Sequence, residues 1–312
     1  MLAITFRRLI LAIPLLILVS LVTFSLQLMT PVDPARMALT AGGTGITIDE
    51  ADVEAKRVEL GLDKPVWRQY LVWCSDVARF DLGRSFMTNR PVSQLFHERI
   101  GASLWLAATA WLASLMVAIP LGLVMARNKG SVLDRVVLAG LSLCASTPGF
   151  WIALLGMWLF AARLQWVPAI GEVSVRGILL PSAVLVLQPM SRLSRLVRAT
   201  TLDLLRNEYV TVARSKGLRE SAITIRHVLP NSISPVLAVI GLDLAALFSG
   251  AAVIEWIFAW PGIGRLSVDA AAAGDLPVLM AFVLVVGCAV VVANLAADLA
   301  SAWIDPRLRE EI

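Results

Sequence analysis

The sequence predicts an all-α polytopic membrane protein with six transmembrane helices and one small folded insertion outside the membrane. Of its 312 residues, 58% are hydrophobic and 16% charged, with a mean hydropathy of +0.78. Soluble globular chains are roughly 45–50% apolar and about 25% charged. The apolar residues also gather in blocks of about 20 residues or more, the length at which a helix crosses about 30 Å of hydrocarbon. This composition argues against a soluble enzyme.

The first apolar block follows Arg7 and Arg8 and covers residues 9–29. A cleaved signal peptide is the alternative, but its apolar core has only about 7–15 residues. We therefore expect segment 1–29 to be a cytoplasmic N-terminus with an uncleaved first transmembrane helix.

Residues 30–99 differ from the rest because they carry 9 Lys/Arg and 10 Asp/Glu. A stretch of this length is too long for a plain connection, so we expect a folded extracytoplasmic insertion. Thr47 to Glu50 has capping-box spacing ahead of a short helix that Gly61 can close. A second helix is expected to start near Pro65, with one face formed by Trp67, Tyr70, Leu71, Cys74 and Val77.

Five further apolar blocks form the expected five-helix core, residues 100–304. They cover residues 102–126, 135–162, 177–198, 233–256 and 277–304. Prolines and glycines are frequent between the fourth and sixth spans, so we expect these helices to be broken or bent. The prolines concerned are Pro181, Pro189, Pro230, Pro235, Pro261 and Pro277.

The distribution of basic residues sets the expected orientation. With both termini in the cytoplasm, the inner segments hold 15 of the 27 Lys/Arg and the short outer loops hold 3. Short loops rich in Lys/Arg stay on the cytoplasmic side. The insertion is then extracytoplasmic, and residues 305–312 form a cytoplasmic tail.

The loop between the fourth and fifth spans, residues 199–232, is charged and has helical propensity. It could simply be a basic helix pair lying on lipid headgroups. However, Ala213 and Gly217 are four residues apart, so they would share a helical face able to approach another surface closely. Gly217 also provides a natural helix end.

The segment Glu208 to Leu218, EYVTVARSKGL, followed by IRHVLPN at residues 225–231, resembles the EAA loop of permease subunits in binding-protein-dependent ABC importers. The form is typical of the dipeptide/oligopeptide/nickel branch. Further resemblances lie at residues 61–73, 81–85, 164–168, 255–265 and 303–307, so nearly the whole chain is covered in the right order. Tyr209 and Val210 stand where many permeases have alanines, and residues 30–34 depart from the usual LPGDP.

The resemblance implies the permease fold of type I ABC importers, with a short coupling helix seated in a cleft of a cytoplasmic ATPase. Carried over to this chain, the ATPase contact would include Glu208, Ala213, Gly217 and Leu218, with Arg214 and Lys216 beside it. The implied partners are a second homologous permease subunit, two ATPase subunits and an extracytoplasmic solute-binding protein. ATP and Mg would be bound by the ATPases, and no cofactor is expected in this chain.

Catalytic and metal-binding motifs are not evident in the sequence. It has no G-x-x-x-x-G-K-[ST] phosphate loop, and its two histidines, His97 and His227, fall on opposite sides of the expected membrane. Ionisable residues within spans are costly and point to function, which singles out Asp243 and Asp298 as pathway candidates. A structural hydrogen-bonded role for both is an equal alternative. Near the outer end, Glu255 and Arg265 are candidates for a gate or a docking surface.

The expected function is that of a non-catalytic permease subunit in the bacterial inner membrane, forming half of the pathway for di- or oligopeptides. Nickel or a metal chelate is the alternative substrate. A channel or secondary carrier that needs no ATP is the alternative from another class, in which Asp243 and Asp298 would form the pathway. A polytopic membrane enzyme would need His, Asp or Glu clustered at one depth, and the sequence shows no such cluster.

Overall fold

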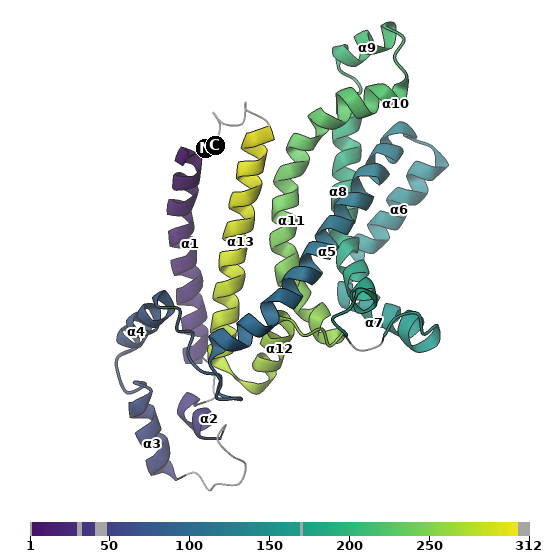
Figure 1. Ribbon diagram of the computed structural model, residues 1–312. Helices are drawn as coiled ribbons and strands as arrows, with labels where there is room; N and C mark the ends of the chain where they lie inside the picture. The colour runs from purple at the N-terminus through teal and green to yellow at the C-terminus, as the bar shows by residue number, and fades with distance from the viewer. Residues whose placement is uncertain (1, 30–32, 41–48, 169–170, 305–312) are drawn as a thin grey trace.

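The computed structural model describes residues 2–29, 33–40, 49–168 and 171–304, and within them the regular structure is helical apart from one isolated bridge between Arg84 and Pro91. Five long helices lie alongside one another (Figure 1). They are α1 (Leu2–Met29), α5 (Val92–Arg127), α8 (Val175–Leu204), α11 (Leu229–Ile257) and α13 (Leu276–Ile304). Helix α5 packs along α8, α11 packs against both α8 and α13, and α1 packs against α13.

Three helices in the described part of the chain are long and apolar enough to cross a membrane. They are α5, α8 and residues 276–297 of α13. The pair formed by residues 132–146 and 149–163 passes the same test when taken together, and residues 12–25 of α1 form a shorter apolar helix. The structure is therefore that of a helical membrane protein.

The third apolar block is bent, although the sequence predicted one span over residues 135–162. Helix α6 (Val132–Ser146) is followed by α7 (Gly149–Gly156) and the π-helix η1 (Met157–Arg163), with a bend of 100° at the break. The cause is Pro148, which disfavours helical geometry at the preceding residue, and Thr147 accordingly adopts an extended ψ of 128°.

The sequence predicted that the fourth span would be broken or bent, and the structure shows that it is not broken. Helix α8 runs from Val175 to Leu204 through both Pro181 and Pro189. Both prolines are buried, so packing against neighbouring helices supports the helix where each ring removes a hydrogen bond. Pro230 lies in the first turn of α11, where a missing N–H costs little.

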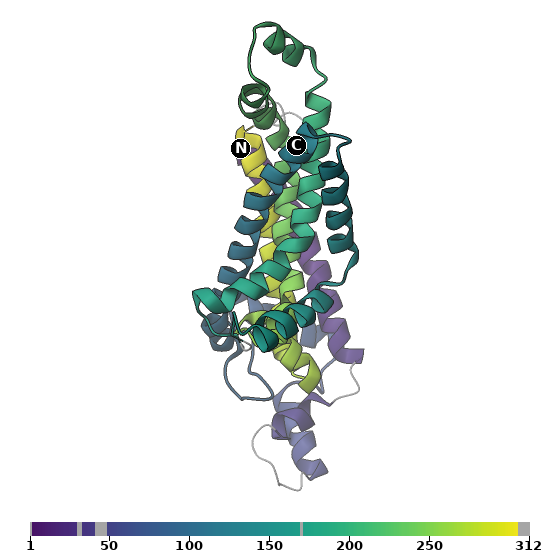
Figure 2. The ribbon, with the colours of Figure 1, turned by 90° about the vertical axis from the view of Figure 1, so that its right-hand side faces the viewer.

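The insertion forms α2 (Pro34–Thr40), α3 (Glu50–Glu59) and α4 (Val66–Ala78) at one end of the bundle (Figures 1 and 2). Gly61 follows α3 with a φ of +69°, and α4 starts after Pro65, as predicted. Thr47 lies outside the described residues, and Asp49 occupies the N-cap position of α3.

Helix α4 packs on α1 through aromatic rings. The ring centroids of Tyr70 and Trp73 lie 5.4 and 5.9 Å from that of Phe24. Trp67 and Leu71, expected on the same face as Tyr70, are exposed. The packed face of α4 is therefore rotated from the predicted one towards Trp73.

The largest buried cluster lies where α5, α8 and α11 meet. It includes Trp260, which is fully buried and whose Nε1 donates to the carbonyl of Ala102 at 3.0 Å. One of the helices in this cluster, α11, carries the candidate residues Asp243 and Glu255.

Candidate functional site

Residues 205–228 form a projection beyond the bundle, which we call the coupling segment. It lies at the end opposite the insertion, the same end of the bundle as the start of α1 and the end of α13 (Figures 1 and 2). It contains α9 (Glu208–Ser215), α10 (Glu220–Ile223) and the π-helix η2 (Thr224–Val228). The end of α8 leads into it and α11 leads out of it, so the segment is attached to the bundle by two long helices.

The coupling segment has a small core of its own. Val210, Ala213, Ile223 and Val228 are buried together, and Leu204 and Leu205 pack against them. Ala213 is only 7% exposed, so its small side chain lies inside the segment rather than on an outward face shared with Gly217. These contacts hold α9 and η2 together as one unit.

An ion pair closes the turn between α9 and α10. Arg214 Nε donates to Glu220 Oε1 at 2.6 Å, and Arg214 Nη2 donates to Glu220 Oε2 at 3.2 Å. The hydrogen bond from Arg214 holds the pKa of Glu220 below its ordinary value of 4.5. The turn is thus fixed by charge on its outside and by apolar packing on its inside.

Gly217 lies at the tip of this turn, with a φ of +76°. L-residues rarely adopt this conformation, and it allows the chain to end α9 as predicted. A Cβ placed on Gly217 would meet no atom within 4 Å, so the tip is open to an approaching surface.

The outer surface of the coupling segment is partly apolar. Exposed fractions are 39% for Tyr209, 52% for Val212, 41% for Leu218 and 60% for Ile225. Glu208, Arg214 and Lys216 are exposed around them. Sequence reasoning selected the charged residues and Leu218 but missed Val212 and Ile225, which only the observed helix rotation shows to be exposed.

Asp243 lies halfway along α11, a helix of 29 residues, with a fully buried side chain. Arg192 Nη2 of α8 lies 3.0 Å from Asp243 Oδ1, although the contact lacks hydrogen-bond geometry, and neither carboxylate oxygen has another partner in the described residues. Both side chains line a cavity of about 250 Å³ between α7, α8 and α11. The sequence singled out Asp243 but not Arg192.

Glu255 and Arg265 hold the turn between α11 and α12 (Ile263–Ala273). The Glu255 carboxylate is buried and accepts hydrogen bonds from the N–H groups of Gly264 at 2.8 Å and Arg265 at 3.1 Å. Arg265 Nη1 donates to the carbonyl of Ala259, at 2.7 Å. Glu255 thus satisfies the free N–H groups at the start of α12.

The remaining pathway candidate, Asp298, belongs to α13, but its side chain lies outside the described part of the structure.

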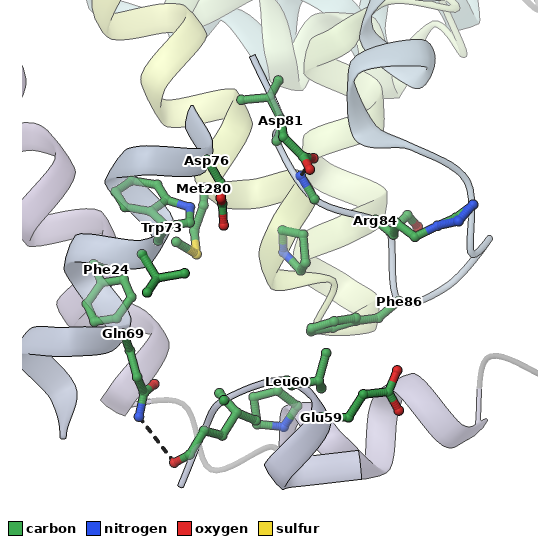
Figure 3. A pocket seen from close by; sticks show the side chains of 18 of the residues that line it. Phe24, Glu59, Leu60, Gln69, Trp73, Asp76, Asp81, Arg84, Phe86 and Met280 are labelled. Carbon is green, nitrogen blue, oxygen red and sulfur yellow. Dashed lines mark hydrogen bonds between the residues drawn. The ribbon is translucent and has the colours of Figure 1, made fainter. Parts of the chain in front are cut away.

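A second cavity, of about 620 Å³, lies between the insertion and the start of α13. Figure 3 shows Trp73 and Phe24 on one side of it, Arg84 and Phe86 on the other, and Leu60 and Glu59 below. Ser85 and Phe86, which line the cavity, are held in place by Asp275. Its carboxylate accepts hydrogen bonds from Ser85 Oγ and from the N–H of Phe86, the latter at 3.0 Å. The insertion is therefore tied to the α12–α13 loop.

Comparison with known proteins identifies the family that this sequence matches. Residues 118–310 match the family described as binding-protein-dependent transport system inner membrane component, and residues 1–107 match the N-terminal region of such components. A Brucella abortus protein provisionally named a peptide transport system permease is 37% identical over 317 residues, covering 99% of both chains. The dipeptide transport system permease protein DppB of Alkalihalophilus pseudofirmus is 33% identical, over 99% of this chain and all of its own. The oligopeptide transport system permease protein AppB of Bacillus subtilis is 32% identical, over 97% of this chain and 98% of its own.

The fold is also similar to that of solved structures of the MetNI methionine ABC transporter in inward-facing conformations. One such chain superposes with a TM-score of 0.59 at 16% identity, covering 68% of this chain and 97% of its own. This likeness supports the fold alone. The family match over most of the chain and the relatives above show that the protein belongs to the binding-protein-dependent transport system inner membrane components, the permease subunits of ABC transport systems.

Proposed function

We propose that this chain forms half of the pathway by which an ATP-driven importer takes up di- or oligopeptides. Support comes from the relatives, which are named for peptide, dipeptide or oligopeptide transport. Nickel or chelate import gains no support from these names. The other half of the pathway would come from a second homologous permease subunit, and peptides would be delivered by an extracytoplasmic solute-binding protein.

Within this proposal the chain crosses the inner membrane six times, with α6 and α7 as one bent span. The coupling segment, the start of α1 and the end of α13 lie at one end of the bundle and the insertion at the other (Figure 1). The positive-inside rule assigns the first of these ends to the cytoplasm. The insertion then stands at the outer mouth, where a solute-binding protein would dock.

The observation that carries the proposed mechanism is the coupling segment, a compact projection with its own core and an exposed apolar surface around Gly217. We propose that it seats in a cleft of a cytoplasmic ATPase, of which the assembly holds two. Glu208, Leu218, Arg214 and Lys216 would lie at the contact, while Ala213 supports it from inside. ATP and Mg would be bound by the ATPases, whose closure would move α8 and α11 together between two access states.

A pair of glycine substitutions tests this contact. Gly217 and Gly130 have φ values of +76° and +78°, and a Cβ added to either would meet no atom within 4 Å, so tryptophan imposes a similar backbone strain at both. Gly130 lies in the α5–α6 loop, at the same end of the bundle but outside the coupling segment. We expect Gly217→Trp to abolish ATP-driven uptake and to weaken recovery of the ATPases with the permease, whereas Gly130→Trp should retain both.

Membrane insertion of both variants is checked by their amounts in isolated membranes. Equal uptake by Gly217→Trp and Gly130→Trp would contradict the proposed contact.

An energy test addresses the channel or carrier alternative. Uptake should stop when ATP is depleted and persist when the proton gradient is collapsed. The opposite pattern would favour a secondary carrier.

A further inference from the structure

We propose that Arg192 and Asp243 form a binding subsite within the pathway that takes the charged ends of a peptide in transit. Asp243 would bind the α-ammonium group and Arg192 the terminal carboxylate. This inference rests on the proposed peptide substrate and extends it to two named residues and to the ligand groups that they recognise.

The first argument is the state of the Asp243 carboxylate. Its side chain has no exposed surface, and both oxygens lack a hydrogen-bond partner in the described residues. Buried carboxylates are normally paired and hydrogen-bonded, because desolvation of an ionised group is costly. An ion pair made only to stabilise α8 against α11 would be expected to satisfy these oxygens.

The second argument is a comparison with another arginine–aspartate pair on the same helix. Arg198 of α8 donates to both oxygens of Asp134, at 2.8 and 2.7 Å, and Asp134 also accepts from the N–H of Gly130 at 2.9 Å. That pair is a saturated link between α6 and α8. The Arg192–Asp243 pair, with one 3.0 Å contact and no hydrogen bond, has unused capacity for a ligand.

The third argument is access. The pair lines the cavity of about 250 Å³, and the Arg192 side chain is 52% exposed although it lies on a membrane-crossing helix. Ionisable residues at such depth typically face a water-filled route or a bundle interior. The volume is below the roughly 300–1,000 Å³ of pockets that enclose a drug-sized ligand, so Arg192 and Asp243 must separate before they can hold the two ends of a peptide.

A peptide passing through the transport pathway can replace the contact between Arg192 and Asp243 by contacts of its own. A zwitterionic peptide offers an ammonium for Asp243 and a carboxylate for Arg192, so the pair can part without leaving either charge uncompensated. Leaving one member of a buried pair alone is strongly destabilising. Because no net charge is gained or lost, the pair can close again when the peptide leaves.

Capped peptides test the subsite. The probes are trialanine, N-acetyl-trialanine and trialanine amide, and their binding to the full complex in lipid nanodiscs is measured without the solute-binding protein. For the parent complex, we expect each cap to weaken binding on the order of tenfold, since each removes one charged contact.

The decisive variant is the double substitution Arg192→Gln with Asp243→Asn. It removes both charges together and so leaves no buried charge unpaired. We expect trialanine to bind more weakly and the three probes to bind equally. The matched control is Arg198→Gln with Asp134→Asn, which removes the saturated pair on the same helix and should leave discrimination between the caps intact.

A purely structural pair would alter the binding of all three probes by the same factor. Persistence of the parental cap penalties in the Arg192→Gln/Asp243→Asn variant would therefore overturn the subsite. Failure of the parent to distinguish the caps would also overturn it. ATP-driven trialanine uptake by the parent with its binding protein is measured in parallel. Uptake without discrimination between the caps refutes the subsite alone. Absence of both uptake and binding refutes peptide transport as well.

Discussion

At the scale of single residues, the turn between α11 and α12 shows how closely this chain packs its backbone. A Cβ on Gly262 would overlap the carboxylate of Glu255 and the hydroxyl of Ser103. The hydroxyl of Ser103 accepts a hydrogen bond from the N–H of Ile263 at 2.9 Å, so both polar groups are already engaged there. Glycine is required at this point because the polar anchors of α12 occupy the space of a side chain.

Substitution of Gly264 by alanine tests this close packing. Its Cβ would lie 2.5 Å from Ala252 Cα and 2.9 Å from Glu255 Oε2, so the two helices must shift. Overpacking of this kind typically costs about 1–3 kcal/mol, and we expect a lower thermal unfolding midpoint for the purified complex. Gly140→Ala is the control, since its Cβ meets nothing within 4 Å. Equal midpoints for the two variants would show that the turn is looser than described.

Residue-scale roles were only partly predictable from the sequence. Asp243 could be found because a carboxylate within an apolar block stands out. Its neighbour Arg192 could not be found, since 51 positions separate the two residues in the chain and only the packing of α8 on α11 brings them together. Glu255 was expected at a gate or docking surface, but nothing in the sequence indicates that its carboxylate folds back onto the start of α12.

At the scale of elements, the coupling segment is the part that sequence reasoning described best. The predicted helix end at Gly217 is confirmed by its positive φ. It could be predicted because glycine is the residue that most often adopts this conformation after a helix. The orientation of α9 was harder to predict, since it depends on contacts between Ala213 and two residues that come well after it in the chain, Ile223 and Val228. The bend at Pro148 was missed because proline count alone does not show which prolines neighbouring helices can support.

The ion pair between Arg214 and Glu220 should make the stability of the coupling segment depend on pH. The pKa of Glu220 in the folded segment is lowered, so the pair stabilises the fold above the ordinary glutamate pKa and loses this effect as pH falls through the lowered value. Both side chains are about half exposed, so the effect should be small. We expect Glu220→Gln to speed amide hydrogen exchange in α9 and α10 at neutral pH, and the difference from the parent to vanish in acid.

A charge-swapped variant, Arg214→Glu with Glu220→Arg, serves as the control and should restore protection at neutral pH. If Glu220→Gln exchanges like the parent at neutral pH, the ion pair does not hold the turn.

At the scale of the whole molecule, two regions far apart in the sequence are joined by Asp275. Its carboxylate binds Ser85 and the backbone of Phe86 and Met87, which connects the insertion to the loop before α13. The composition of residues 30–99 predicted a folded unit, but the sequence could not show where that unit is attached. Six separate apolar blocks likewise indicate how many helices to expect without indicating which of them touch.

Removal of this link should loosen the insertion. Hydrogen bonds to a charged group contribute about 1.5–3 kcal/mol each, so Asp275→Ala should raise the open population of residues 81–91 more than tenfold. Trypsin added to the extracytoplasmic side should then cut faster after Arg84, which precedes Ser85. Asp269→Ala removes an exposed carboxylate of α12 that contacts Trp256 rather than the insertion, so its cleavage rate should match that of the parent. Unchanged cleavage of Asp275→Ala would show that the insertion is held by other contacts.

The way in which the coupling segment is strung between α8 and α11 has a mechanical consequence. These two helices are also the ones that carry Arg192 and Asp243. A displacement of the coupling segment at Gly217 would therefore be transmitted to Arg192 through α8 and to Asp243 through α11. Unequal movement of the two helices would shift the two side chains relative to each other. Movement of the coupling segment by a cytoplasmic partner would in this way control the strength of the contact between Arg192 and Asp243, although the two sites are far apart.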